Sequence, residues 1–486
     1  MWLPERQKSM VPTSTFYRGA FGSEFRAVAQ KCYVEFDLVT CVGPRLVEHL
    51  SAFAFASLSY SQQLILVLSV LISGLLGIYS IHAWMLTLLA FRRRTPLAPS
   101  RPSAWPSVSV HLPVYNERQV ISRLIDSVLA FDYPRNKLEI IVVDDSNDDT
   151  TEVVRSYQKR YPGLVTAIHR DKPDGFKAGA LQAALERSKS ELFVLFDADH
   201  IPQPDFLQRM VPYLCSNGAI AFAQARQSYL QDVDSWIARA LGLGIDAYAF
   251  VDQEARFSHD LLTHFSGSGG VFRTKAVIDV GGWSSQTLAE DLDLSIRLRL
   301  SGWRWVYDKS VEYPGELPAS FAILRRQQFR WASGFAGCLS KHLRSLLTTD
   351  KMSLAQKGEA LIYLSEYAAS PLIAIGVVFA VLYCLVFPVD FILYGPLHSA
   401  LSAFTVIMSA FIYTAPLAMF TVAVYRATNG WPQRIGRVLD LIYLGVLSVG
   451  IFLTSARAVV EGFLNKATYF YRTPKRGYVT ASKANV

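Results

Sequence analysis

The sequence is poor in charged residues and lacks paired cysteines. Asp, Glu, Lys and Arg make up only 18% of its 486 residues, whereas hydrophobic residues make up 51% and the mean hydropathy is +0.22. The five cysteines are odd in number, scattered, and include no Cys-x-x-Cys pair. Such usage argues against a disulfide framework and against a zinc module. The composition is typical of a membrane protein whose soluble portion lies in a reducing compartment.

Signatures of several other protein classes are also missing. We find no Walker loop, no Ser-His-Asp set and no zinc-ligand spacing. The net charge is +8, but the basic residues do not gather on a nucleic-acid face, so we expect no nucleic-acid partner. They flank apolar segments instead, at 92–94, 426–437 and 466–476, which is typical of the cytosolic side of membrane spans, with solvated loops as the alternative. Residues 1–30 carry charges and no continuous apolar core, so we expect no cleavable signal peptide.

The length exceeds what one hydrophobic core usually serves, so we expect at least two structural units. An N-terminal region, 1–63, which we expect to be amphipathic, precedes the first long apolar segment. That segment, 64–91, carries no charged side chain over 28 residues, enough for a transmembrane helix of about 42 Å. The arginines at 92–94 place the next part of the chain in the cytosol, and a linker, 92–106, contains four prolines.

Between residues 107 and 345 the pattern changes to short apolar runs that alternate with amphipathic intervals. The predicted strands are 108–112, 138–143, 192–196 and 219–223, and the predicted helices are 117–130, 149–160, 176–188 and 204–216. This alternation predicts an α/β domain with a mostly parallel sheet. In such sheets ligands bind at the carboxyl ends of the strands.

The last third of the chain is apolar again. We expect an interfacial helix within 346–368, then transmembrane and interfacial helices within 369–465, with spans near 370–394 and 399–424. The segment 438–463 is interrupted by Asp440, Arg457 and Glu461, and it lies between two basic segments that should share the cytosolic side. We therefore predict that it is interfacial or re-entrant, followed by a cytosolic tail, 466–486.

Acidic pairs follow two of the predicted strands. Asp144 and Asp145 come directly after 138–143, where a turn or a helix cap is an equally good interpretation. Asp197 and Asp199 form an acid-x-acid element after 192–196. Two carboxylates there can hold Mg²⁺ or Mn²⁺ against a diphosphate, and the metal would offset charge on a nucleotide leaving group.

The ordered set of motifs resembles the processive family-2 glycosyltransferases with a GT-A catalytic domain, most closely the cellulose-synthase-like mannan and glucan synthases. The likeness covers roughly 107–345 and 462–477. It rests on Leu112–Glu117, Asp144–Ser146, Gly175–Ala180, Phe196–Asp199, Gln224–Arg226, Gly281–Trp283, Glu290–Asp293 and Gln327-x-x-Arg330-Trp331. The resemblance implies a GT-A fold, a Rossmann-like mixed sheet, inserted between transmembrane and interfacial helices.

The resemblance also implies roles for single residues. Asp291 would be the general base that takes the proton of the acceptor hydroxyl, which implies inversion. Asp197 and Asp199 would bind Mg²⁺ or Mn²⁺. The nucleotide sugar would be bound by Tyr115, Glu117, Asp144, Asp145, Lys177, Asp197, Gln327, Arg330, Thr473 and Lys475. The acceptor would be bound by Trp331, Ser268, Gly269 and Glu290.

Two positions depart from the family pattern. Ala289 stands where the family usually has Thr before the Glu-Asp pair. In the tail, Phe470–Lys475 is similar to the gating loop of cellulose synthases, but Arg472 replaces Val.

His111, His169, His200 and His264 form no motif and are interpreted as structural, although His200, beside the metal motif, could also be a ligand.

These features imply a multi-pass membrane protein with a cytosolic catalytic domain. We expect a metal-dependent, inverting β-hexosyltransferase that polymerises hexose units from GDP-mannose or UDP-glucose and passes the polysaccharide through its own helices. Its partners would be the nucleotide sugar, the growing polysaccharide and membrane lipids. The first alternative is a glycolipid synthase that transfers one sugar to ceramide or diacylglycerol. The second is a transporter or scaffold with a degenerate catalytic domain, which the full set of carboxylates disfavours.

Overall fold

The computed structural model describes residues 59–92, 99–230, 235–318, 320–386, 398–464, 475 and 477, with 398–406 and 409 given by backbone alone. The chain divides into two compact units. One comprises Met1–Val67 with Tyr383–Thr405, and the other comprises Leu68–Leu382 with Val406–Val486. The sheet and every described residue of the sequence motifs lie in the second unit.

A seven-stranded mixed sheet forms the centre of the second unit, in the order β3-β2-β1-β4-β6-β5-β7. Its strands are β1 Val108–Val114, β2 Leu138–Asp144, β3 Val165–His169, β4 Leu192–Leu195, β5 Ile220–Tyr229, β6 Gly270–Arg273 and β7 Arg304–Gly315. Four neighbouring pairs are parallel, and β6 alone among these strands runs antiparallel to its neighbours, β4 and β5. The parallel register aligns Val114 of β1 with Asp144 of β2, so the ends of both strands meet at one edge.

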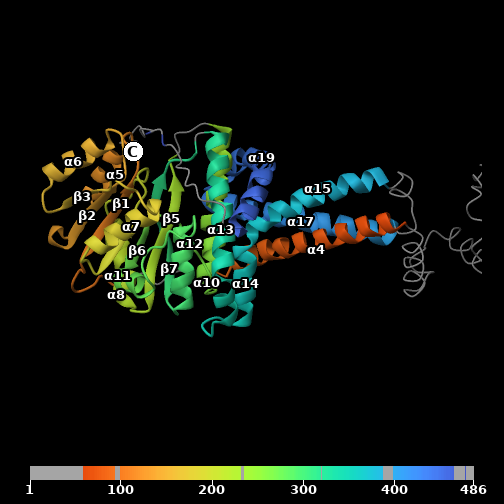
Figure 1. Ribbon diagram of the computed structural model, residues 1–486, viewed down its shortest axis with the longest axis horizontal. Coiled ribbons are helices and arrows are strands. Elements are labelled where there is room, and N and C mark those ends of the chain that lie inside the picture. Colours follow the sequence, from red (N-terminus) through yellow and green to blue (C-terminus); the bar gives the residue numbers. More distant parts are fainter. Residues whose placement is uncertain are drawn as a thin grey trace, which may run out of the picture. The chain divides into compact units, whose positions relative to one another are not determined.

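Helices cover both faces of this sheet, and long apolar helices occur elsewhere in the described part of the chain (Figure 1). The described helices are α4 Tyr60–Leu89, α5 Ile121–Leu129, α6 Thr150–Arg160, α7 Phe176–Arg187, α8 Phe206–Ser216, α9 Trp236–Ala247, α10 Gln253–Ser258, α11 Thr274–Asp279, α12 Glu290–Leu300, α13 Phe321–Thr348, α14 Leu354–Leu364, α15 Ala369–Val386, α17 His398–Ala427, α18 Trp431–Gly436 and α19 Val438–Phe463. Single turns occur at η2 Arg135–Lys137, η3 Tyr248–Asp252 and η4 Glu366–Ala368.

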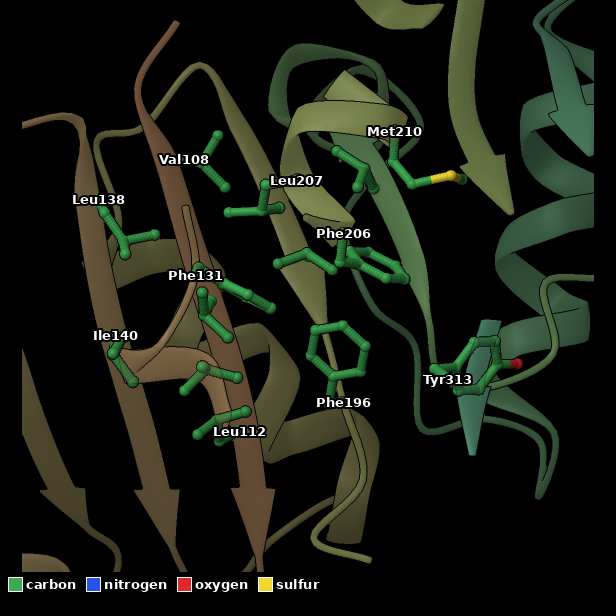
Figure 2. Close-up of a cluster of buried hydrophobic side chains, with 14 of the residues drawn as sticks. Val108, Leu112, Phe131, Leu138, Ile140, Phe196, Phe206, Leu207, Met210 and Tyr313 are labelled. Atoms are coloured by element: carbon green, nitrogen blue, oxygen red, sulfur yellow. The ribbon is translucent and has the colours of Figure 1, made fainter. Parts of the chain in front are cut away.

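Both faces of the sheet are covered because successive side chains of a strand point to opposite sides. Leu192 and Val194 of β4 belong to the cluster under α5 and α8, whereas Phe193 and Leu195 belong to the cluster under α7 and α12. Figure 2 shows the first cluster, in which β1 and β2 contribute Val108, Leu112, Leu138 and Ile140, and α8 contributes Phe206, Leu207 and Met210. Burial on both faces explains why these strands read as nearly continuous apolar runs.

Within the described residues, four helical segments are long and apolar enough to cross a membrane, judged by length and composition. They are Tyr60–Leu89, Glu366–Val386, Ala410–Ala427 and Trp431–Phe463. The first three correspond to the predicted spans 64–91, 370–394 and 399–424, of which 387–394 lies outside the described residues. The fourth contains the segment that we predicted to be interfacial.

The charged residues of α19 are satisfied by partners. Asp440 is fully buried, accepting from Arg239 Nε of α9 at 2.8 Å and pairing also with Arg437. Arg457 pairs with Glu461 one turn later at 2.6 Å. These interruptions of the apolar pattern are therefore contacts with the sheet domain and within the helix, which is why they are tolerated beside apolar neighbours.

A buried ionic cluster connects the first long helix with the sheet domain. Arg256 of α10 is fully buried and donates to Asp252 at 2.9 Å and to Glu359 of α14 at 2.7 Å. Glu359 Oε1 also lies 3.0 Å from Nε2 of His82 in α4. Because one guanidinium bridges two carboxylates away from water, its loss would leave both carboxylates buried without a countercharge.

Candidate active site

The two aspartates at the end of β2 are both held by neighbours. Asp144 is buried, and its carboxylate accepts from the backbone N–H of Ser146 at 3.0 Å and from the hydroxyl of Thr151 at 2.6 Å, with His169 Nδ1 at 3.0 Å. Asp145 receives a two-pronged contact from Arg170, at 2.7 and 2.6 Å. Both side chains are thus oriented before any ligand binds.

Beside them, the loop after β1 turns sharply. Asn116 adopts a left-handed φ of 54°, and its backbone N–H donates to the hydroxyl of Ser146 at 2.8 Å. Tyr115 is 44% exposed, whereas Glu117 is buried. The tyrosine ring therefore borders solvent next to the aspartates, at the strand edge where ligands of α/β sheets bind.

Lys177 connects three parts of the site. Its Nζ lies 2.7 Å from Asp197 Oδ1 and 3.6 Å from Glu290 Oε1, and it donates to the backbone carbonyl of Gly267 at 2.9 Å. Burial alone would lower the pKa of Lys177, but the carboxylates of Asp197 and Glu290 outweigh burial and raise it. The lysine is therefore a fixed positive charge in the middle of the acidic cluster.

The second acid of the pair, Asp199, is matched by a lysine from the far end of the chain. Its Oδ2 lies 2.8 Å from Lys475 Nζ and accepts from the backbone N–H of Glu316 at 2.9 Å. Burial would raise the pKa of Asp199, but Lys475 overcomes this and holds it below its usual value. Its other oxygen, Oδ1, is buried with no hydrogen-bond partner among the described residues.

A glycine-rich loop, Ser266–Gly270, forms the floor of the site. The amide of Gln224 in β5 accepts from the backbone N–H of Ser266 at 3.1 Å and donates to the carbonyl of Ser268 at 3.1 Å. Gly269 has a φ of +67°, and a Cβ there would lie 2.1 Å from the ring of Tyr313. Only glycine fits at this position, because both the backbone angle and the space exclude a side chain.

Ser268 connects this loop to the acid-x-acid element through its buried side chain. It is only 1% exposed, and its hydroxyl accepts from the backbone N–H of Asp197 at 3.2 Å and lies 3.1 Å from His200 Nδ1. Burial lowers the pKa of His200. The hydroxyl thus connects the floor with the acid-x-acid element and does not point to solvent.

Glu290 and Asp291 are the first two residues of α12. The carboxylate of Asp291 accepts from the backbone N–H of Leu292 at 2.7 Å, and a Cβ on Gly267 would lie 3.0 Å from its Oδ2. Burial raises the pKa of both carboxyls, with each countered by Lys177 and Arg330, and the charge of Asp291 raises the pKa of Glu290 further. A carboxylate with a raised pKa is a better proton acceptor, as a general base requires.

Asp293, one turn further along α12, fastens this helix to α13. It is fully buried and contacts Lys341 Nζ at 2.6 Å, His342 Nε2 at 2.8 Å and Arg297 Nε at 2.9 Å. Burial would raise the pKa of Asp293, but His342 and Lys341 hold it below its usual value. This residue therefore positions α12 and stays away from the reacting groups.

The Gln-x-x-Arg-Trp motif lies on α13, which begins at a serine N-cap: the hydroxyl of Ser320 accepts from the backbone N–H of Ile323. Trp331 is 39% exposed, and Arg330 is close enough to Glu290 and Asp291 to lower the pKa of both. The helix approaches α12 closely, since a Cβ on Gly334 would lie 2.7 Å from the Cβ of Ala289.

A cavity of about 630 Å³ opens beside these groups. It is bounded by the N-terminus of α7, the loop 285–288, one face of α13 and Gly462 of α19. Glu290 and Lys177 line it, together with Gly175, Phe176, Ala178, Ser285, Gln286, Thr287, Leu288, Ser333, Gly337, Ser340 and Lys341. Its volume falls within the range of small-molecule sites, and its hydroxyl, amide and ammonium groups suit a polar ligand.

The structure brings most of the predicted residues together. Lys177, Asp197, Glu290, Asp291 and Arg330 form one cluster through the contacts given above. Asp144, Asp145, Tyr115 and Glu117 gather at the ends of β1 and β2, and Lys475 approaches Asp199. Gln327 and Trp331 share α13 with Arg330 but take no part in these contacts, and Thr473 lies outside the described residues. The roles assigned to all these residues remain predictions.

Sequence reasoning missed three supporting residues. Gln224 was part of a quoted motif but had no role, and Arg170 and Asp293 lay within or beside motifs without being singled out. A buried amide among apolar strand residues was the available signal for Gln224, because buried polar groups require partners. For Arg170 the sequence offered no signal beyond its place before Gly175–Ala180. The four histidines form no cluster, although His169 and His200 both contact groups of the site.

Comparison with known proteins first defines the class of fold. A solved mannosyltransferase, PcManGT from Pyrobaculum calidifontis in complex with GDP-Man and Mn²⁺, superposes with a TM-score of 0.57 at 18% identity, covering 83% of this chain and 99% of that one. At this identity the likeness concerns the fold alone. The mixed sheet with its flanking helices is thus a GT-A-like fold, as the motifs predicted.

Sequence comparisons point to the same class of protein. Residues 106–334 match the family described as "Glycosyltransferase like family 2". Rice glucomannan 4-beta-mannosyltransferase 1 (Oryza sativa subsp. japonica) is 36% identical over 293 residues, which are 59% of this chain and 56% of the relative. Glucomannan 4-beta-mannosyltransferase 9 of Arabidopsis thaliana is 33% identical, over 59% of this chain and 54% of the relative. The chain spans about half the length of these curated relatives. The match of residues 106–334 to this family agrees with the resemblance that the motifs carry.

Proposed function

We propose that the protein is a membrane-bound, inverting β-mannosyltransferase that builds a β-linked polysaccharide from a nucleotide-activated mannose. The observation that carries the proposal is the cluster of Lys177, Asp197, Glu290, Asp291 and Arg330 beside a polar cavity. Similarity to glucomannan 4-beta-mannosyltransferases supports mannose over glucose, and with it GDP-mannose as donor.

The donor's diphosphate would lie near Asp197, Lys177 and Arg330. Within the described part of the chain, no group of three or more His, Cys, Asp or Glu side chains could hold a metal by itself. Asp197 and Asp199, with the unpartnered Oδ1 of Asp199, suit a divalent cation that takes its other ligands from phosphate oxygens. Such an ion, Mg²⁺ or Mn²⁺, would supply charge neutralisation at the leaving group.

Asp291 would act as the base. Its raised pKa favours proton uptake from an acceptor hydroxyl, and its position at the start of α12 fixes its direction. Lys177 and Arg330 would stabilise the negative charge that develops on the departing diphosphate, because fixed cations are effective at a site shielded from water. Displacement at the anomeric carbon with one base inverts the configuration, from an α-linked donor to a β-linked product.

Trp331 and the floor of the site would hold the acceptor. Trp331 presents a partly exposed apolar ring, on which a sugar ring can stack. Ser268 and Gly269 would act through the backbone, since the serine hydroxyl is already engaged by Asp197 and His200. Passage of the product through the helices is an extension of this proposal.

Attachment to the membrane would involve α19 as a surface helix. One face of α19 packs on α13 and α9, with Gly462 so close that its Cβ would lie 2.5 Å from the carbonyl of Ser333. Its other face is apolar and open, with Val446, Val449 and Leu453 at 58%, 70% and 63% exposure. A helix that packs on the protein along one side and exposes apolar side chains along the other suits the boundary between cytosol and lipid.

The test is sugar transfer by purified protein in nanodiscs. Radiolabelled GDP-mannose, UDP-glucose, UDP-GlcNAc and UDP-galactose are supplied separately, with Mn²⁺ or Mg²⁺. The proposal expects a high-molecular-weight product from GDP-mannose that β-mannanase degrades. A single-sugar product that extracts into organic solvent would identify a glycolipid synthase instead, and polymer from UDP-glucose alone would change the sugar.

A further inference from the structure

Arg170 occupies a junction that none of the motifs describes. Its guanidinium makes four contacts with two separate parts of the site. It donates to the carboxylate of Asp145 from Nε at 2.7 Å and from Nη2 at 2.6 Å. It also donates to the carbonyls of Asp174, at 3.0 Å from Nη1, and of Phe176, at 3.1 Å from Nη2.

The two carbonyls flank a turn whose backbone is strained. Gly175 has a φ of +74° and Phe176 has a φ of +50°. A non-glycine residue with a left-handed φ is strained and persists only where its surroundings hold it. Lys177 comes immediately afterwards, so the conformation of this turn decides where the lysine's ammonium group points.

A glycine makes room for this arrangement. A Cβ on Gly179 would lie 2.0 Å from the carbonyl oxygen of Asp174 and 2.7 Å from Nη1 of Arg170. Any side chain at position 179 would therefore push the arginine or the turn away. The turn and Arg170 are therefore held together in two ways, by the hydrogen bonds to the carbonyls of Asp174 and Phe176 and by the close packing at Gly179.

We propose that Arg170 is a positioning residue that sets the distance between Asp145, on the nucleoside side, and Lys177, on the diphosphate side. The inference rests on the proposed function, in which these two residues bind one nucleotide sugar. The guanidinium does this through its geometry, because its five N–H donors are spread over three nitrogen atoms and can make these four contacts at once, whereas an ammonium group has three donors on one atom. The enzyme would in this way recognise a nucleoside diphosphate as a unit of fixed length.

The readout is the preference for GDP over GMP. It is the dissociation constant for GMP divided by that for GDP, measured by titration of the nanodisc-held protein with Mn²⁺ present. Loss of the nucleoside contact affects both ligands equally, whereas misplacement of Lys177 affects only the ligand with a β-phosphate. Arg170→Met should lower the ratio about tenfold, the usual scale for one charge-assisted hydrogen bond. Arg170→Lys keeps the charge and should fail to restore the ratio. In a Lys177→Met background, Arg170→Met should change it no further.

Four further variants guard the test against misfolding and chance effects. Asp145→Asn combined with Arg170→Gln removes both charges together, so no buried carboxylate is left unpaired, and it should lower the ratio as well. Gly179→Ala should lower it without altering any charge, whereas Gly358→Ala, at a helical glycine with open space around it, should not. Arg187→Met, at the exposed far end of α7, is the matched arginine control.

The outcomes separate this inference from the proposed function. If the wild-type protein binds GDP and GMP equally, the proposed donor site is wrong and the inference is lost with it. If the wild type prefers GDP while Arg170→Met and Gly179→Ala keep the wild-type ratio, only the positioning role is overturned. Full restoration by Arg170→Lys would also overturn it, since charge alone would then suffice.

Discussion

Lys177 Nζ lies 2.7 Å from Oδ1 of Asp197, and the pair joins the start of α7 to the end of β4. The same ammonium group is within 3.6 Å of Glu290 and contacts the glycine-rich floor at Gly267. One lysine therefore fixes the spacing of the acid-x-acid element, the start of α12 and the floor. The site is organised by this positive charge as much as by its carboxylates.

Asp291→Asn should abolish sugar transfer and leave donor binding nearly intact. The amide cannot accept the acceptor's proton, and general-base catalysis contributes about 10²–10⁴-fold to the rate. The measurement is kcat from product formation beside the dissociation constant for GDP-mannose. Turnover within about fivefold of the wild type would exclude Asp291 as the base, and a similar loss of donor affinity would assign it to binding. Asp279→Asn, at an exposed carboxylate of α11 paired with Lys275, serves as the control.

Asp291→Asn should also stabilise the protein at neutral pH. Burial raises the pKa of Asp291 in the folded state, so its contribution to stability is full below the ordinary aspartate value of about 3.9 and is lost as pH rises through the folded-state pKa. We expect a melting midpoint at pH 7 that is higher by about 2–4 °C, and little difference near pH 4.

Asp293→Asn should do the opposite. Although burial acts against it, His342 and Lys341 lower the pKa of Asp293, so its charge stabilises the folded state above the ordinary aspartate value, and this is lost as pH falls through the folded-state pKa. The variant should therefore melt lower than the wild type at pH 7. Differential scanning fluorimetry of both variants across the pH range checks the two signs together. Midpoints shifted in the same direction would contradict the assigned pKa directions.

Gly269→Ala should remove transfer activity and destabilise the protein. The methyl group would lie about where the Tyr313 ring now packs, 2.1 Å from its nearest atom, and the φ of +67° disfavours any side chain. Overpacking of this kind typically costs about 1–3 kcal/mol. Gly244→Ala, with nothing nearby, is the control, and activity assays with thermal melts are the readout. Combining Gly269→Ala with Tyr313→Leu should recover part of the stability, and failure to do so would mean that the backbone angle dominates.

The placement of α19 can be tested by labelling. In a variant without native cysteines, single cysteines are introduced before α19 in the sequence, as Gln433→Cys, and after it, as Lys466→Cys. If the helix lies at the interface, a membrane-impermeant maleimide labels both cysteines from the same face of sealed vesicles. Labelling from opposite faces would show that α19 crosses the bilayer, and the proposed surface position would then be wrong.

Strand and helix positions were readable from the chain because they depend on near neighbours. The runs 138–143 and 192–196 predicted β2 and β4 closely, since strands buried on both faces must be apolar throughout. Val438–Phe463 was predicted with its observed ends, because its apolar run begins after the basic residues of 426–437. The acidic pairs after these strands predicted the ligand edge, since parallel strands end together.

The tertiary structure alone decided which distant groups meet. Nothing local reveals that β6 inserts antiparallel between β4 and β5, and this strand brings the floor at Gly267 to Lys177. The same is true of Lys475 beside Asp199 and of Arg170 between Asp145 and the turn before α7. By itself, the sequence determined the elements and the chemical character of the site, because hydrophobic periodicity and residue type act locally. The pairing of charges required the packed fold, because an ion pair depends on distance in space and not on separation along the chain.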